Sequence, residues 1–368
     1  MRDRGRGRTR TIAAAALCLV ACATVARGAE PLPVPAIEWN PRQYVCCRAI
    51  EPIELDGRLF DRAWGAAEWT EDFVDIEGPG KPAPRFQTRA KMLWDDDCLY
   101  IGAHLEEKDV WATLRERDSV IFQDNDFEVF IDPDGDTHEY YELEVNAFGT
   151  DWDLLLVKPY RDGGPAVNAW DIRDLRSGAH VIGTLNEPWD TDKGWSVEIA
   201  IPWSVLAECA HRDAPPKPGD EWRVNFSRVE WQVQIAEGGY AKKLDPATGK
   251  PFPEDNWVWS PQGLVNMHYP EMWGIVRFSG AEGKKCEETF VRDPRHEDAW
   301  ALRRVYYAER NWRAAHGGFT GDLTDLGLDL GESYAGRVSL GAGPHWFVAT
   351  LSLPDGGALH IREDGRLW

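Results

Sequence analysis

Positive charge is scarce in this chain, and several metal-binding motifs are missing from it. Its 41 basic residues stand against 62 acidic ones, which gives a net charge of −21 at pH 7. The electrostatic field of such a negative chain repels phosphate backbones, which argues against a nucleic-acid partner. No CxxC pair or Cys/His spacing indicates zinc, and no CxxCH motif indicates covalently held haem. Met267, His268 and Met272 could supply axial haem ligands, but ordinary packing explains them better.

Apolar runs long enough to span a membrane are missing after residue 26. At the N-terminus, five arginines are followed by the small, apolar stretch 11–26. This pattern predicts a signal peptide over 1–28, cleaved after Gly28 to release a soluble protein. Alternatively, residues 19–22 (LVAC) resemble the bacterial lipobox, in which Cys22 is acylated and becomes the new N-terminus. We therefore expect an exported protein that is periplasmic, extracellular or an outer-membrane lipoprotein, with membrane contact only through such an anchor.

Cysteine is also sparse beyond the signal segment. The five that remain are Cys46, Cys47, Cys98, Cys209 and Cys286. An odd number leaves at least one thiol unpaired in an exported chain. The adjacent pair could join only in a strained ring, so we expect scattered, buried thiols.

Turn-forming residues and short segments of alternating apolar and polar residues divide the remaining chain into three regions. Four prolines in residues 29–42 predict an extended linker. Many short strands with little helix then predict an antiparallel β-sandwich of the immunoglobulin-like or jelly-roll type over 43–280. Residues 287–368 read as a small α+β appendage of unknown role. Its helix is expected over 296–317, with three strands near 336–340, 346–352 and 357–362.

The segment 120–153 shows the clearest strand pattern. Phe127, Val129 and Ile131 fall on one face of a first strand, and Tyr141, Leu143 and Val145 on one face of a second. This period of two predicts a hairpin with one face in the core and one polar-aromatic face.

The hairpin tip is rich in oxygen ligands. Asp132, Asp134 and Asp136 alternate, with Glu139 close behind, as a calcium loop requires. The EF-hand pattern fails, because its glycine and its twelfth-position glutamate are missing. Two readings therefore stay open, a bound calcium ion and a solvated acidic turn.

Aromatic residues point to a saccharide partner. Nineteen tryptophans is a high number, and flat aromatic rings cover the apolar faces of sugars while carboxylates, amides and arginine bind the hydroxyls. The rings with this potential are Phe122, Phe130, Tyr140, Trp231, Trp257 and Trp259, and the polar side chains near them are Asp124, Asn125, Arg228, Gln232 and His268.

Carboxylates on the polar face offer an alternative, catalytic reading. A glycoside hydrolase needs an acid and a nucleophile or base at a defined separation. Five residues could supply them: Asp124, Asp126, Glu128, Glu142 and Glu144. No nucleophile motif accompanies them, and acidic chains offer such pairs by chance.

Residues 43–280 resemble the family 9-like carbohydrate-binding domains, which are relatives of the modules attached to bacterial xylanases. Five motifs carry the resemblance in order: IELDGRLFDRAW (53–64), MLWDDDCLYIGAHLEE (92–107), QDNDFEVFIDPDGD (123–136), WSVEIAIPW (195–203) and PEMWGIVRF (270–278). The resemblance implies a β-sandwich, saccharide binding, frequent structural calcium and association with glycoside hydrolysis. The xylanase modules clamp a sugar between two tryptophans, whose places here hold Phe122 and Met267.

We therefore predict non-catalytic carbohydrate binding in the context of carbohydrate catabolism. Phe122, Trp257 and Trp259 are expected to stack on the sugar, and Asp124, Asn125, Arg228 and His268 to hydrogen-bond it. The alternatives are a glycoside hydrolase acting on O-glycosyl bonds and an envelope structural or interaction protein.

Overall fold

The computed structural model describes residues 30–282 and 288–368. The predicted signal peptide with Cys22, and also Cys286, lie outside these residues. Within them, no helix combines the length and the apolar character that crossing a bilayer requires.

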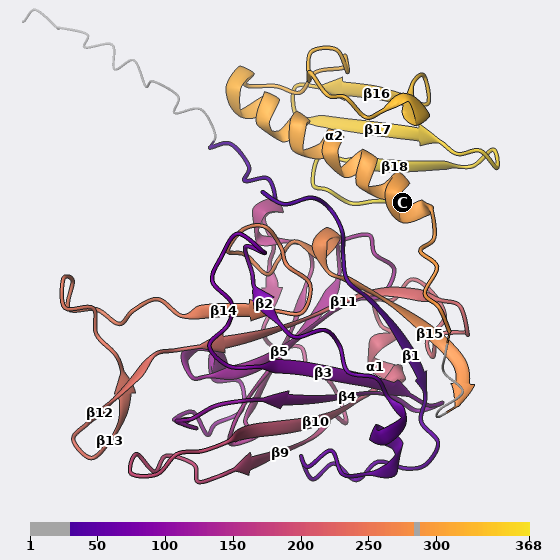
Figure 1. Cartoon of the computed structure of the whole chain (residues 1–368). Helices are drawn as coiled ribbons and strands as arrows, with labels where there is room; N and C mark the ends of the chain where they lie inside the picture. Colours follow the sequence, from indigo (N-terminus) through magenta and orange to yellow (C-terminus); the bar gives the residue numbers. More distant parts are fainter. Residues whose placement is uncertain (1–29, 283–287) are drawn as a thin grey trace, which may run out of the picture.

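One long, strongly curled sheet makes up the first part of the chain, and its two halves pack face to face as a β-sandwich (Figure 1). The strand order is β8-β7-β6-β5-β11-β15-β1-β3-β4-β10-β9, with β14 beside β11 and β2 beside β14. The bounds are β1 Gln43–Arg48, β2 Val74–Asp75, β3 Thr88–Trp94, β4 Cys98–Leu105, β5 Asp126–Asp132, β6 Tyr140–Asn146, β7 Asp151–Leu156, β8 Ala166–Val167, β9 Arg176–Ile182, β10 Gly194–Pro202, β11 Glu221–Glu230, β14 Asp255–Val258 and β15 Gly274–Glu282.

The core lies between the two halves of this sheet. Met92 and Ile101 from one half share it with Phe127, Leu143 and Phe226 from the other. The predicted core face of the hairpin is confirmed, because Phe127, Val129, Ile131, Tyr141, Leu143 and Val145 are all buried there. Residues at alternate positions of β5 and β6 therefore point away from this core.

Two segments rich in proline, glycine and polar residues contain strands. The stretch 158–192 holds β8 and β9, and 234–256 overlaps the hairpin of β12 (Val233–Ala236) and β13 (Gly239–Lys242). In β9, the sequence RSGAHVI has no clear apolar alternation, and the strand exists because it pairs along β10. A short helix, α1 (Trp203–Leu206), follows Pro202.

The C-terminal part is a helix on a small sheet. Helix α2 (Arg295–His316) packs against β17 (Trp346–Ser352) and β18 (Ala358–Arg362), and β16 (Val338–Gly343) completes the sheet (Figure 1). Gly317 ends the helix at φ +82°, a left-handed conformation that glycine adopts without strain. The expected α+β character and element order are thus observed.

Residues 30–42 do not form the free linker that their prolines predict. The backbone of Leu32 donates a hydrogen bond to Asn311 of α2 at 2.6 Å, and the Tyr269 hydroxyl donates to the Pro33 carbonyl at 2.9 Å. Trp39 is buried in a second core with Tyr269 and Met272 from the sandwich and Leu302 from α2. This segment therefore ties the sandwich to the C-terminal part.

The described cysteines follow the sequence prediction in part. Cys46 and Cys98 are buried free thiols, and Cys209 is a half-buried one. Cys47, however, is disulfide-bonded, so the expectation of scattered thiols is wrong at this position.

Candidate functional site

The acidic hairpin tip is held by its own backbone and by the C-terminal part. Asp132 accepts hydrogen bonds from the Gly135 and Thr137 amides, both at 2.9 Å. Asp136 pairs with Arg366 at 2.9 Å. The three aspartates do offer oxygens within 4.8 Å of one another, so the calcium prediction keeps a suitable donor set. The loop also serves as a docking contact for the C-terminal part.

Two tryptophans predicted to stack on sugar lie in the core instead. Trp257 and Trp259 are 2% and 0% exposed. Trp259 packs against Tyr44 and Phe226, and Trp257 packs against Phe86. Their alternation in the sequence places them on one face, but that face points inward. The stacking prediction is therefore wrong for both rings, because neither presents an open face.

Three predicted hydrogen-bonding residues are also fully engaged inside the protein. Asp124 accepts bonds from the Thr113 and Leu114 amides at 2.7 and 2.9 Å. Arg228 is 0% exposed and joins Glu107 and Glu230 at 2.7 and 2.8 Å. Asn125 is likewise buried, between Glu107 and the Trp231 amide. The structure assigns these side chains to internal networks, which corrects the expectation that they face a ligand.

His268 lies beside Tyr140, on the side of β6 that points away from the core between the two halves of the sheet. Its ring is 3.0 Å from the Tyr140 hydroxyl and packs edge-on against Tyr160. Burial and the nearby Arg161 lower the pKa of His268 to about 3, so the ring is neutral at physiological pH. Met267 packs with Phe130 and Trp273, as ordinary packing predicts.

Four carboxylates cluster on the face of β5 and β6 that points away from the core, which we call the outer face. Glu128 of β5 lies directly opposite Glu144 of β6 in the strand pairing. Asp126 and Glu142 occupy the neighbouring positions on the same face, and all four side chains are buried. The sequence prediction that these residues share one face is confirmed. The apolar end of this face is closed by Phe130, Tyr140, Leu154, Val258 and Trp273.

Burial shapes the chemistry of this acidic cluster, and no described basic residue forms an ion pair with it. Burial, followed by the charge of Glu128, raises the pKa of Asp126, Glu142 and Glu144 well above the ordinary carboxylate range. Burial also raises the pKa of Glu128 itself to about 7. A buried carboxylate without a basic partner is costly in its charged form, so it takes up a proton, as these raised pKa values indicate, or it is neutralised by a bound group.

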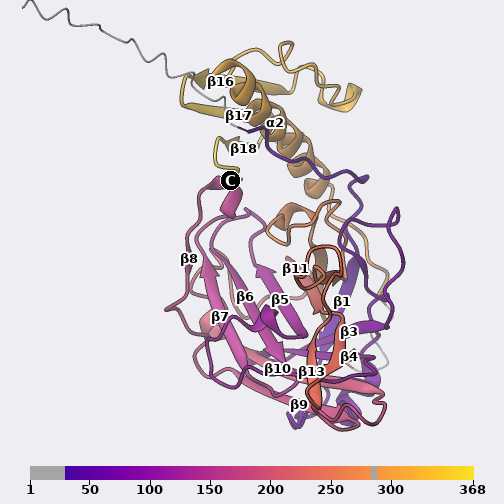
Figure 2. The same ribbon diagram turned by 90° about the vertical axis from the view of Figure 1, so that its left-hand side faces the viewer.

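Half-buried aromatic residues flank the acidic cluster. Phe122, in the 3-10 turn Ile121–Gln123, donates its amide to Glu144 at 2.8 Å. Trp152 lies opposite Glu144 on β7, and its ring centre is 6.3 Å from that of Phe122. Tyr160 is 51% exposed, and partial burial, followed by the charges of Glu142 and Glu144, raises the pKa of its hydroxyl. Figure 2 shows β5, β6, β7 and β8 side by side on this side of the molecule.

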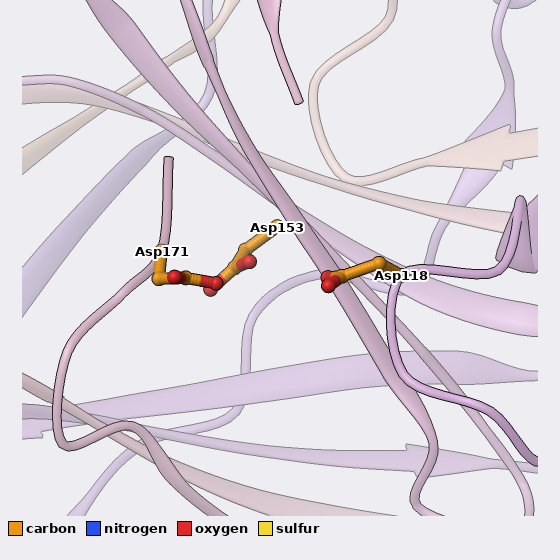
Figure 3. Close-up of side chains that lie close together, drawn as sticks. All are labelled: Asp118, Asp153 and Asp171. Atoms are coloured by element: carbon orange, nitrogen blue, oxygen red, sulfur yellow. The ribbon is translucent and has the colours of Figure 1, made fainter. Parts of the chain in front are cut away.

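A second group of aspartates nearby has a different character (Figure 3). Asp118, Asp153 and Asp171 place oxygens within 4.8 Å of one another. Arg117 forms ion pairs with all three, at 3.2, 2.8 and 2.6 Å. The guanidinium thus supplies the positive charge that this group requires.

Of these three aromatic residues, Phe122 is among the predicted sugar contacts, whereas Trp152 and Tyr160 are not. Trp152 could have been found, because the alternation in DWDLLL puts it on the same face as Leu154 and Leu156 of β7. Tyr160 follows the strand in a short 3-10 turn, where no periodicity indicates direction.

Residues 55–221 match the family model described as "Carbohydrate family 9 binding domain-like". No curated protein matches the chain.

Among solved structures, a family 9 carbohydrate-binding module from Caldicellulosiruptor kristjanssonii in complex with cellotriose is 15% identical, covering 68% of this chain and 100% of its own, with a TM-score of 0.43. A putative carbohydrate-binding protein from Bacteroides uniformis is 16% identical, covering 65% and 100%, with a TM-score of 0.47. Over residues 55–221, this chain is therefore similar to the carbohydrate family 9 binding-like domains.

Proposed function

We propose that the sandwich binds carbohydrate at the acidic end of its outer face and does not turn it over. The observation that carries the proposal is the group of partly or largely exposed aromatic residues, Phe122, Trp152 and Tyr160, around buried carboxylates in a domain similar to this family. Aromatic rings cover the apolar face of a sugar, and carboxylates at the base accept its hydroxyl hydrogens. Weak affinity for a single sugar is expected, because desolvating hydroxyls offsets much of the gain.

The cellular setting is part of the proposal and is supported by the N-terminal residues alone. The charged and apolar segment before residue 28 supports export, and LVAC at 19–22 supports acylation of Cys22. We propose that the protein works outside the cytoplasm in carbohydrate catabolism, where weak glycan binding holds the protein near its polymer.

A glycan array is the test of this function. We expect the mature protein to bind oligo- or polysaccharides, with and without a chelator, and to release no product from aryl glycosides or polysaccharides. Hydrolysis that Asp126→Asn abolishes while binding persists would contradict the non-catalytic role. An array without any bound glycan would contradict carbohydrate binding and leave the interaction or envelope-structural alternative.

A further inference from the structure

The sheet of β16, β17 and β18 packs one face on α2 and turns the other outward (Figure 1). Along β17, Phe347, Ala349 and Leu351 are buried toward the helix, whereas Trp346 and Ser352 are exposed. The outward positions of β17, together with the residues paired with them on β16 and β18, form a surface that we call the tryptophan face. It lies outside residues 55–221, which match the family model.

Trp346 lies flat on β16 at one end of the tryptophan face. A Cβ atom added at Gly343, the residue paired with it, would lie 2.6 Å from the indole Nε1 and 3.1 and 3.2 Å from the two ring atoms bonded to that nitrogen. These short distances place the Cβ position over the ring plane, because an approach along the ring edge would put both neighbouring atoms farther away. One ring face therefore rests on the glycine backbone, and the residue is 50% exposed.

Trp368 provides a second ring on the tryptophan face. Its backbone exchanges hydrogen bonds with His360 of β18 at 2.9 and 3.1 Å, as directly opposed residues of antiparallel strands do. The two rings stack with their centres 5.2 Å apart and their planes at 24°. The His360 ring is itself held by the Thr350 hydroxyl, which lies 2.8 Å from its Nδ1. One face of the Trp368 indole is thus covered, while the residue is 52% exposed.

The strip between the two rings carries hydroxyl groups and a paired charge. Thr350 is four residues from Trp346 on β17, and Ser339 lies opposite Thr350 on β16. Arg362, on the same face of β18, is bound by Asp364 at 2.7 Å. Four residues along β17 and two strand spacings separate the backbones of the two tryptophans by roughly 16 Å. The face therefore combines two separated flat rings, hydroxyl groups between them and a neutralised arginine.

We propose that the tryptophan face binds a neutral polysaccharide, with Trp346 and Trp368 stacking on separate sugar rings of one chain and Thr350 hydrogen-bonding to hydroxyls between them. A flat aromatic ring covers the apolar face of a pyranose, and polar side chains bind its hydroxyls. A polymer fits because the two rings are too far apart for a single sugar. The paired arginine offers no free charge to an acidic glycan, and the net charge of −21 repels one.

A proline-rich peptide is the other ligand that exposed aromatic residues bind. Such a peptide docks in grooves between aromatic side chains. Trp346 and Trp368 instead rest on Gly343 and His360, so each presents a flat surface and not the wall of a groove. The geometry therefore favours the polysaccharide, and the peptide serves as a comparison in the test.

This face acts independently of the sandwich site, because Phe122, Trp152 and Tyr160 do not belong to it. A disaccharide is too short to contact both tryptophans, so it reports on the sandwich site, whereas an insoluble polymer reports on the tryptophan face. Two sites on one chain also raise the apparent affinity for a polymer, because the first contact increases the effective concentration at the second.

The test is depletion of the mature Trp152→Ala protein, which lacks the proposed sandwich site, by particles of cellulose, xylan and chitin assayed separately. We expect this protein to retain binding to at least one polymer. Adding Trp346→Ala or Trp368→Ala should weaken that binding by at least about tenfold, whereas Trp346→Phe keeps a flat ring and should retain most of it. Adding Trp189→Ala, which removes an exposed ring from the sandwich, should change nothing. Melting curves establish that the variants fold.

A Trp152→Ala protein that binds none of the three polymers, or added Trp346→Ala and Trp368→Ala changes that leave its binding intact, would overturn the proposal. Binding of a polyproline peptide that Trp346→Ala abolishes would also overturn it, since that result assigns the face to a proline-rich partner. The sandwich proposal fails on a different observation, which is an unchanged affinity of Trp152→Ala for a soluble disaccharide that the wild type binds.

Discussion

Replacing Glu271 with alanine is expected to lower the free energy of unfolding by about 3–5 kcal/mol, the cost of removing one partner from a buried ion pair. Glu271 follows Pro270 at the end of the sandwich and is buried. Its carboxylate binds Arg161 at 2.8 Å and accepts the Tyr307 hydroxyl from α2. The change leaves buried Arg161 with only the longer ion pair to Asp162 at 3.4 Å, and it weakens the contact between the sandwich and the C-terminal part. Urea unfolding of the wild type and the variant measures the effect.

Control variants make this result specific. Glu297→Ala removes an exposed carboxylate from the start of α2, and the free energy of unfolding should change by no more than about 0.5 kcal/mol. Glu271→Gln keeps an acceptor for Tyr307 and should lie between the wild type and alanine. An alanine variant as stable as Glu297→Ala would refute the role given to Glu271.

The same carboxylate gives a pH signature. Burial alone would raise the pKa of Glu271, but Arg161 and Arg303 lower it to about 2. A depressed pKa stabilises the folded state above the unfolded value near 4.5, and this contribution is lost as the pH falls toward 2. The loss corresponds to about 3 kcal/mol. The wild type should therefore lose stability more steeply than Glu271→Gln between pH 4.5 and pH 2.

The second large effect concerns Trp152. Trp152→Ala should weaken binding of an array-identified glycan by at least about tenfold, because a stacking ring at the centre of a site carries much of the binding free energy. Trp152→Phe keeps a flat ring and should retain most of the affinity. Isothermal titration with the same glycan measures all three proteins.

Trp189 provides the matched control for this experiment. It is 73% exposed in the segment between β9 and β10, and Trp189→Ala should leave the affinity unchanged. If Trp152→Ala binds the glycan as tightly as the wild type does, Trp152 does not contribute to the sugar site. Melting curves of the variants exclude a general loss of folding.

The strand alternation predicted the core well, because its period of two fixes which side chains share a face. Phe127, Val129 and Ile131 are buried as expected, and the helix at 295–316 begins one residue from its predicted start. Trp257 and Trp259 show the limit of this reasoning. The sequence alternation correctly predicts that the two side chains share one face. That this face points into the core depends on the pairing of β14 with β11 and β2, which the sequence does not reveal.

The acidic cluster was predictable as a group and unpredictable in its environment. The sequence placed Asp126, Glu128, Glu142 and Glu144 on one face, which the structure confirms. Their burial depends on segments far along the chain, and so does the internal pairing of Arg228 with Glu107. Such long-range contacts leave no periodic signal in the sequence.

The most direct test of the central claim is photoaffinity labelling with a diazirine derivative of an array-identified glycan, followed by mass spectrometry of peptides. We expect labels on the segments around Phe122, Trp152 and Tyr160. Another candidate surface is the groove between the sandwich and the C-terminal part, about 910 Å³ and lined by residues that include His211, Arg295 and Trp368. Labels confined to that groove, with none around Phe122, Trp152 and Tyr160, would contradict the account.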